Sequence, residues 1–581
     1  MISAMSCLKN TCFLKGVVTL ATLFVFILIS ACAEESDYPA CGAAKIIYDK
    51  ATGELVSGPE EILLDEPPYY DPKRLPKEGN ELKNIRDGLW RLDQEVTESS
   101  VAEPDDIVRI LLSLPLRDEE KLNEWLEKVY DPEADEYLNF VSSSCLTYLH
   151  SPQPESIGRV KTYLESYNLS VDRIARNRLL IIASGKVSDI QDAFNFELIR
   201  VIRVRRPDFA TESELKVPDW IVDDIEGLIS IQDMPDNPQL PVDDGLVKFV
   251  PYAGRVTPKE LNKAYGNQQF IDKGMDGRGQ AIGIIVGWIA RETDLESYFL
   301  SLGIEREGSI KWRFTDFPPP IFSNETTVDI QMVGSTAPGS DLLIYVASDN
   351  TDFSLTWATN ETVGDNKVSV ISYSFSHQEV ITSWELQQHQ SRAAKLAAAQ
   401  GITFYAASGD SRNVDTPANS PWVTAVGSSY LIMDDNFERS EEIDAWFGGR
   451  GRSALFAKPE WQRKIDPEGM RRATVDLSIH AMADMLQDSL YVFTKGDWLM
   501  SGGTSLAAPL LAGMTACVNQ ARGDKGRLGW INRTIYENEE VQATFIDVTD
   551  VWMPPNEATP GWDFGTGWGA PNVDKWPEAI P

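Results

Sequence analysis

Residues 501–509 read S-G-G-T-S-L-A-A-P, and small and apolar residues continue beyond them. Gly502 and Gly503 permit a tight turn, and Ala512 and Ala516 continue the helical pattern. Ser505 is therefore expected at a helix N-terminus, where backbone N–H groups and the helix dipole favour negative charge. This is suitable chemistry for a serine nucleophile, but a turn in which Ser505 merely caps a helix has the same pattern.

A nucleophilic serine needs a base, and histidine is scarce in this chain. The four histidines are His150, His377, His389 and His480. None stands in the H-G-T-like string that carries the base of subtilisins. A histidine-dependent subtilisin working at neutral pH, to be tested by replacing His377 and His480, is therefore only an alternative.

Two carboxylates offer a different base. Glu325 and Asp329 lie four residues apart, so they share one face of the expected helix. Two acids so placed cannot both ionise cheaply and can share a proton. Such a pair accepts a proton from Ser505 in acid, although a solvated acidic helix face would show the same spacing.

A third acid, Asp410, follows the apolar run 402–406 in the string A-A-S-G-D. It is expected at the C-terminal edge of a sheet, where open α/β folds bind ligands. A protonated carboxyl group there can donate a hydrogen bond to an oxyanion. The alternative is an ordinary S-G-D surface turn.

Apolar runs dominate the second half of the chain. They cover 281–286, 342–346, 368–372 and 402–406, and helical patterns separate them. Near-continuous apolar strands that alternate with helices predict an α/β fold, with a parallel sheet covered by helices on both faces.

The three motifs occur in one order, E-x-x-x-D, then S-G-D, then G-G-T-S-x-x-x-P. Together they resemble the sedolisin family of serine-carboxyl peptidases. The resemblance implies a subtilisin-like parallel sheet flanked by helices, preceded by a small α+β, ferredoxin-like propeptide domain similar to the pro-kumamolisin domain. The string V-T-P-x-x-L, residues 256–261, resembles the usual start of the mature enzyme.

The chain divides into five expected parts. Residues 1–33 are a signal peptide, 34–85 a tether, 86–230 the activation propeptide, 231–250 a linker and processing region, and 251–581 the peptidase. Within the propeptide, Leu122, Trp125, Leu126 and Val129 have helical spacing. Pro235, Pro238 and Pro241 mark the linker.

The resemblance also implies a role for each acid. Ser505 would be the nucleophile and Glu325 the general base. Asp329 would orient Glu325, and Asp410 would donate to the oxyanion where subtilisins use a side-chain amide. Two strings depart from the family: 374–379 read S-F-S-H-Q-E where relatives often have S-Y-G-x-x-E, and Arg412 follows Ser411 where relatives usually have Gly.

The C-terminal region resembles the family's calcium site. Hard oxygen ligands suit Ca²⁺, and one structural ion is expected. Its ligands would be the carboxylates of Asp547 and Asp563 and the carbonyls of Val548, Thr559 and Gly561. Thr559 stands where the family usually has Gly, which puts the backbone geometry there in question.

The first residues resemble an export signal. Lys9 and Lys15 precede an apolar run over 17–29, and the string I-S-A-C ends at Cys32. A lipobox would make Cys32 the lipidated N-terminus, whereas cleavage at the A-C-A string would leave no anchor. Cys41 and Cys145 could pair in an oxidising compartment, which the sequence alone does not decide.

The net charge of the chain excludes one class of binding partner. The 88 acidic and 53 basic residues leave a formal charge of −35. Phosphate backbones repel such a chain, so nucleic acid is not an expected partner. The expected partners are a protein or peptide substrate and the chain's own propeptide, with membrane contact only through a lipid on Cys32.

The sequence therefore predicts a secreted or envelope-attached zymogen of an acid-acting serine-carboxyl peptidase. Endopeptidase and tripeptidyl-peptidase activities both remain open. A catalytically silent binding lipoprotein with the same fold is the alternative from another functional class.

Overall fold

The computed structural model describes residues 47–48, 55–57, 81–90, 96–203, 206–235, 240–243, 245–444, 447–482, 489–551 and 558–581. The expected signal peptide, the lipidation site at Cys32 and nearly all of the expected tether lie outside these residues. Within them, no helix has both the length and the apolar character needed to cross a bilayer.

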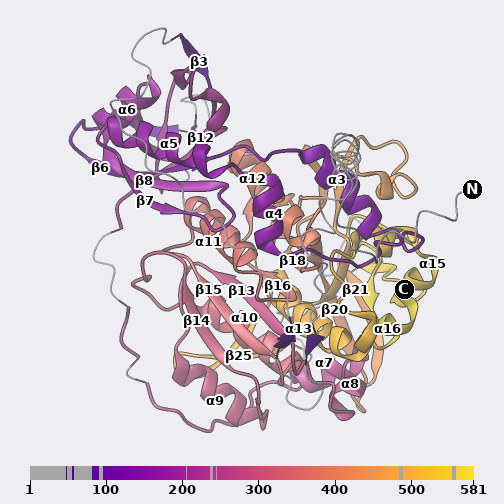
Figure 1. Cartoon of the computed structure of the whole chain (residues 1–581). Helices are drawn as coiled ribbons and strands as arrows, with labels where there is room; N and C mark the ends of the chain where they lie inside the picture. Colours follow the sequence, from indigo (N-terminus) through magenta and orange to yellow (C-terminus); the bar gives the residue numbers. More distant parts are fainter. Residues whose placement is uncertain are drawn as a thin grey trace, which may run out of the picture.

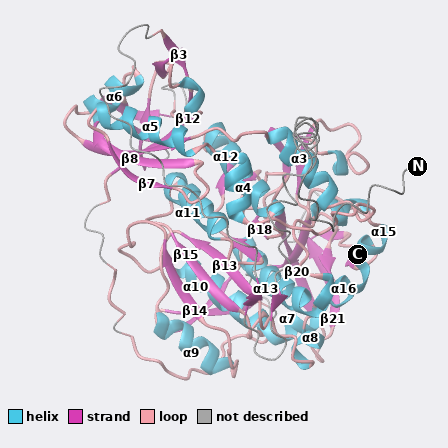
Figure 2. Ribbon diagram, in the orientation of Figure 1, coloured by secondary structure: helices cyan, strands magenta, loops and turns pink. Residues whose placement is uncertain are grey.

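A large twisted sheet forms the centre of the second half of the chain (Figures 1 and 2). Its parallel strands lie in the order β14, β15, β13, β16, β18, β20, and β24 also pairs with β20 in parallel. The antiparallel strand β21 and the short β28 extend the sheet beyond β20. Their bounds are β14 Ile310–Phe314, β15 Asp341–Val346, β13 Ala281–Val286, β16 Val370–Tyr373, β18 Thr403–Ala407, β20 Thr424–Met433, β24 Leu477–His480, β21 Arg439–Asp444 and β28 Asp550–Val551.

Helices cover this sheet because its central strands are apolar along their whole length. Every residue of β16 and β18 is buried, which requires cover on both faces. Helix α10 (Asn324–Thr336) packs against α13 (Thr504–Arg522), and α11 (Asp352–Asp365) packs against α12 (Trp384–Ala399). The expected subtilisin-like parallel sheet flanked by helices is confirmed.

A second, smaller sheet precedes this unit. Its order is β4-β12-β6-β8-β7; β4 pairs with β12 in parallel, and the other three pairs are antiparallel. With α5 (Pro154–Ser166) and α6 (Val187–Phe194), the chain order is β6-α5-β7-β8-α6-β12, the ferredoxin-like arrangement. The strand bounds are β4 Arg86–Asp87, β12 Gly227–Asp233, β6 Ile107–Ser113, β8 Leu180–Lys186 and β7 Ser170–Ile174.

The helix predicted from Leu122 to Val129 is present as α3 (Glu119–Val129), but it does not pack on the small sheet. Leu122 and Leu126 belong to the core of the larger unit, and Tyr130 donates a hydrogen bond to the Ala398 carbonyl. Helix α4 (Ser143–His150) follows α3, and its Cys145 is disulfide-bonded. Cys41 lies outside the described residues, so the expected pairing stays a prediction.

The two units meet along one face of the small sheet. Leu111 and Ile182 from the sheet form an apolar cluster with Phe353, Trp357 and Leu386 from α11 and α12. Farther along the chain, the described part of the linker runs over α9 (Glu292–Leu302), where the N–H groups of Lys248 and Val250 donate to serine hydroxyls of that helix.

Candidate active site

Ser505 lies in the first turn of α13, as the G-G-T-S string predicts. Gly503 is the N-cap residue with φ of 116°, a conformation that glycine adopts without strain. Its N–H donates to the Ala481 carbonyl at 2.8 Å, which ties the turn to the end of β24. The turn therefore leaves Ser505 partly exposed at the helix N-terminus.

Glu325 and Asp329 lie in α10, the helix that packs on α13. Ser323 caps α10 by accepting a hydrogen bond from the Thr326 N–H at 3.3 Å. Burial raises the pKa of Glu325 to about 7; the neighbouring Ser505 side chain opposes this rise, and the Asp410 charge adds to it. The titratable group beside the Ser505 side chain is thus a carboxyl group.

Asp329 lies deeper in the same helix and is fully buried. Burial raises its pKa well above the usual range, and the charge of Glu325 raises it further. Its Oδ1 accepts a hydrogen bond from the Ser374 hydroxyl at 2.6 Å, which acts in the opposite direction. Two neighbouring acids with raised pKa values retain a proton between them near neutral pH.

Ser374 was not among the predicted site residues. It follows β16 directly, and its hydroxyl also lies 3.5 Å from the Ser505 carbonyl oxygen. The sequence contains one signal for this residue: Ser374 begins the S-F-S-H-Q-E string, at the end of the strand that faces the site.

Asp410 follows β18 and meets the turn before Ser505. Its Oδ1 accepts hydrogen bonds from the Thr504 N–H at 2.8 Å and the Thr504 hydroxyl at 3.0 Å. The Thr504 hydroxyl in turn accepts from the Gly409 N–H at 3.1 Å. The S-G-D and G-G-T-S strings, about ninety residues apart, therefore form one interlocked pair of turns.

Arg412 is one of the departures from the family pattern. Its φ is 59°, in the left-handed region that favours glycine, and relatives usually have glycine there. The arginine is accommodated, with its N–H donating to the Phe447 carbonyl at 3.2 Å.

The histidines have other partners. The Nδ1 atom of His480 accepts from the Leu431 N–H, and His377 forms an ion pair with Asp352 at 2.8 Å. His389 is buried against the small sheet, and its ring lies 3.2 Å from the Ser113 hydroxyl. These contacts give no support to a histidine base.

Four of the five predicted calcium ligands form two hydrogen-bonded pairs in the C-terminal region. The Gly561 N–H donates to Asp547 Oδ2, and the Thr559 N–H donates to Asp563 Oδ2, both at 2.8 Å. Within the described part of the chain, no three acidic, histidine or cysteine side chains form a metal-holding group. The two carboxylates fit Ca²⁺ if backbone carbonyls, among them the predicted carbonyl of Val548, supply the remaining oxygen ligands.

Comparison with known proteins assigns both units. Residues 94–234 match the family model described as "Pro-kumamolisin, activation domain", and residues 321–569 match the subtilase family. Kumamolisin from Bacillus sp. (strain MN-32) is 29% identical over 475 residues, which cover 73% of this chain and 82% of that protein. Sedolisin from Pseudomonas sp. (strain 101) is 26% identical over 520 residues, which cover 81% and 86%.

A solved structure has the same architecture. The structure of Pseudomonas sedolisin, a serine-carboxyl proteinase complexed with two molecules of pseudo-iodotyrostatin, superposes with a TM-score of 0.50 at 26% identity. The alignment covers 57% of this chain and 99% of that one.

Proposed function

We propose that this chain, which belongs to the sedolisin family of serine-carboxyl peptidases, is a zymogen whose peptidase acts in acid through Ser505, Glu325, Asp329 and Asp410. The observation that carries the proposal is that Glu325, a buried carboxyl group with a raised pKa, lies close enough to the Ser505 side chain for that side chain to influence its pKa.

The proposed reaction follows from these contacts. The Ser505 oxygen attacks the peptide carbonyl carbon, and its proton passes to Glu325. Asp410, when protonated, donates a hydrogen bond to the oxyanion that forms. Collapse of this intermediate transfers the proton from Glu325 to the leaving amine. Water, activated by Glu325, then hydrolyses the acyl-enzyme.

The same roles imply a bell-shaped pH profile in the acid range. Asp410 can donate only while it carries a proton, so the proposed role requires acid. Activity also falls at very low pH because the Glu325/Asp329 pair then takes up a second proton and no longer acts as a base.

The decisive experiment compares the wild-type chain with Ser505→Ala. Both are purified without residues 1–33, shifted to about pH 4, and examined by mass spectrometry for new N-termini and for products from a peptide mixture. Ser166→Ala is a matched control, since that hydroxyl donates to the Tyr163 carbonyl within the propeptide. Wild type and control should be processed in the linker and cut peptides, while Ser505→Ala does neither.

If all three proteins stay intact and inert in acid and at neutral pH with calcium present, the silent binding protein replaces the peptidase proposal. If the peptidase is active, product lengths distinguish tripeptide release from internal cleavage.

The export signal and the anchor at Cys32 complete the proposal and rest on the pattern of residues 9–33 alone. Cys32→Ala should move the protein from the membrane fraction to the soluble fraction of the cells that express it. An unchanged distribution would exclude the lipid anchor.

A further inference from the structure

Arg109 of the propeptide is fully buried, which is unusual for an arginine. Its Nη1 atom lies 2.6 Å from Asp316 Oδ2, and both side chains are nearly inaccessible to solvent. The guanidinium also lies over two aromatic rings, 5.1 Å from the Phe317 centroid and 5.6 Å from the Phe353 centroid. A carboxylate together with aromatic faces is a favourable environment for a planar cation.

The residues around this guanidinium belong to the peptidase unit and are held in place by that unit. Asp316 follows β14, and Thr315 before it donates its N–H to the Val346 carbonyl at 3.0 Å. The Ser348 hydroxyl donates to Asp316 Oδ2 at 3.2 Å. The Trp357 indole N–H, from α11, donates to the Thr315 carbonyl at 3.1 Å. These contacts do not involve Arg109, so Asp316 is positioned without it.

Departure of the propeptide would leave this pocket without its cation. Asp316 Oδ1 also accepts from Arg173 Nε at 2.9 Å, and Arg173 belongs to the propeptide strand β7. Propeptide Arg176 pairs in the same way with Asp365 at 2.8 Å. Asp365 would keep its pairs with Arg313 and Lys367 of the peptidase, whereas Asp316 would lose both of its propeptide arginines.

We propose that Asp316, Phe317 and Phe353 form an arginine-binding site of the peptidase, filled by Arg109 in the zymogen and open to an arginine of a bound peptide after processing. The second half of this statement rests on the proposed function.

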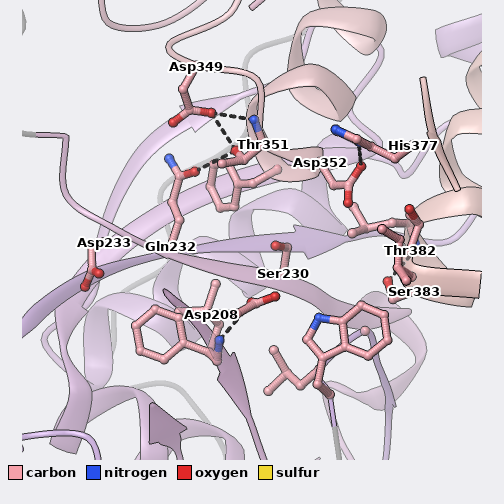
Figure 3. A pocket seen from close by; sticks show the side chains of 18 of the residues that line it. Asp208, Ser230, Gln232, Asp233, Asp349, Thr351, Asp352, His377, Thr382 and Ser383 are labelled. Carbon is pink, nitrogen blue, oxygen red and sulfur yellow. Dashed lines mark hydrogen bonds and ion pairs between the residues drawn. The ribbon is translucent and has the colours of Figure 1, made fainter. Parts of the chain in front are cut away.

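A neighbouring cavity lies between the propeptide and the peptidase (Figure 3). It measures about 390 Å³, and Phe353 lines it together with Asp352 and His377 of the peptidase and Gln232 of the propeptide. His377 lies three residues after Ser374, a chain distance of at most about 11 Å. A peptide that follows this strand from Ser505 would thus lead toward the arginine pocket.

The first test uses the full chain at pH 7 and needs no peptidase activity. Arg109→Ala, in a Ser505→Ala background that keeps the chain intact, creates an empty pocket. Methylguanidinium is then added, and thermal unfolding is measured. A ligand that binds only the folded state raises Tm, so we expect a rise of about 2 °C or more at saturating methylguanidinium.

Three controls make the test specific. Methylurea has a similar planar shape without charge and should give no rise. The chain with Arg109 intact should not respond, since its pocket is filled. The Arg109→Ala chain that also carries Asp316→Asn should lose the response. No rise with methylguanidinium, or an equal rise in any control, overturns the proposed site.

A second measurement tests peptide binding directly. It starts from the wild-type chain, so it remains possible if the Arg109→Ala chain fails to fold. The wild-type chain, processed in acid, is titrated with a hexapeptide that contains arginine and with the same peptide that contains citrulline. Binding of the arginine peptide should be at least tenfold tighter, and Asp316→Asn should remove the difference. Equal affinities overturn the peptide-binding role, whereas a chain that is never processed points to failure of the proposed function.

Discussion

At the scale of single residues, the proposed site depends on the proton shared by Glu325 and Asp329. Both carboxyl groups are removed from water, and each disfavours ionisation of the other. This arrangement lowers the stability of the fold when both carboxyl groups are charged, and it provides a base when only one of them is charged. The two predictions at this scale separate these effects.

Asp329→Asn should stabilise the chain at neutral pH. The folded-state pKa of Asp329 is raised, so its ionisation destabilises the fold increasingly as pH rises above its unfolded value of 3.8. Asparagine removes that cost and can still accept the hydrogen bond from Ser374. We expect a higher Tm than wild type at pH 7, no difference near pH 3, and lower peptidase activity. A lower Tm at pH 7 would contradict the assigned burial cost.

Asp410→Asn should extend activity toward neutral pH. An amide donates a hydrogen bond without needing a proton from solution, so the alkaline limit set by Asp410 disappears. The acid limit, which the Glu325/Asp329 pair sets, should stay where it is. The profile of kcat/KM against pH measures both limits; an unchanged alkaline limit would exclude Asp410 as the oxyanion donor.

At the scale of elements, two turns must fit together before the site exists. The turn after β18 and the turn before α13 are joined through Thr504, and a Cβ on Gly503 would come within 2.7 Å of Asp410 Oδ2. The absence of a side chain at Gly503 is therefore a requirement of the site as well as of the turn.

Gly503→Ala should reduce kcat by about 100-fold or more because it displaces Asp410, the proposed oxyanion donor. Gly523→Ala is the matched control: its φ is 55°, also left-handed, but a Cβ there meets nothing within 4 Å. Both variants should lose some Tm, and only Gly503→Ala should lose kcat. Equal losses of kcat would mean that backbone strain alone explains the effect.

The loop between Asp547 and Asp563 supports a prediction on calcium. If Ca²⁺ stabilises the folded state from a hundredfold excess over its dissociation constant, chelation should lower Tm by about 5–10 °C. Added Ca²⁺ should restore it. Asp547→Asn should abolish the response, whereas Asp550→Asn, an exposed acid three residues away, should retain it. The same Tm with and without chelator would rule out the site.

At the scale of the whole molecule, the face between propeptide and peptidase contains ionisable groups. Glu226 of the propeptide forms hydrogen-bonded ion pairs with Arg392. Burial alone would raise the pKa of Glu226, but the contacts with Arg392 outweigh burial and lower this pKa to about 2. Burial lowers the pKa of His389 to about 3; the Arg392 charge adds to this and Glu226 opposes it. Arg86 and Glu385 complete the charged lining of the small cavity around this cluster.

The sign of both shifts favours propeptide release in acid. The pairing of Glu226 stabilises the closed zymogen above its usual pKa of 4.5 and is lost as pH falls toward 2. His389 is neutral in the zymogen and would regain a pKa near 6.5 once exposed. Protonation of the separated peptidase therefore opposes closure from about pH 6.5 downward, by up to roughly 100-fold at pH 4.5.

His389→Gln should therefore shift the pH of half-maximal processing downward by about one unit. The His389 ring lies 3.2 Å from the Ser113 hydroxyl and 3.2 Å from Asn360 Oδ1. Glutamine can hydrogen-bond to both but takes up no proton. The rate of processing is followed against pH, with the activity of already processed enzyme as the control that separates release from catalysis. An unchanged processing profile would show that His389 does not govern release.

The amino-acid sequence alone determined those features of the protein that depend on local patterns of residues. Apolar runs that alternate with helical periods predict the parallel sheet, because both faces of such strands must be buried. The motif order predicted the family, which is confirmed, and singled out Ser505, Glu325, Asp329 and Asp410, which the structure brings together in one site. Their roles, and the boundaries of the five expected parts, stay predictions.

Only the tertiary structure decided which distant segments touch. Nothing in the spacing of Leu122 and Leu126 indicates that α3 packs on the peptidase, because an amphipathic helix specifies an apolar face and no partner. The partners of Ser374 and Thr504, and the pocket around Arg109, are equally invisible in the sequence. Each is a contact between residues from about forty to more than two hundred positions apart, and such contacts exist only once the sheet and its helices have folded and excluded water.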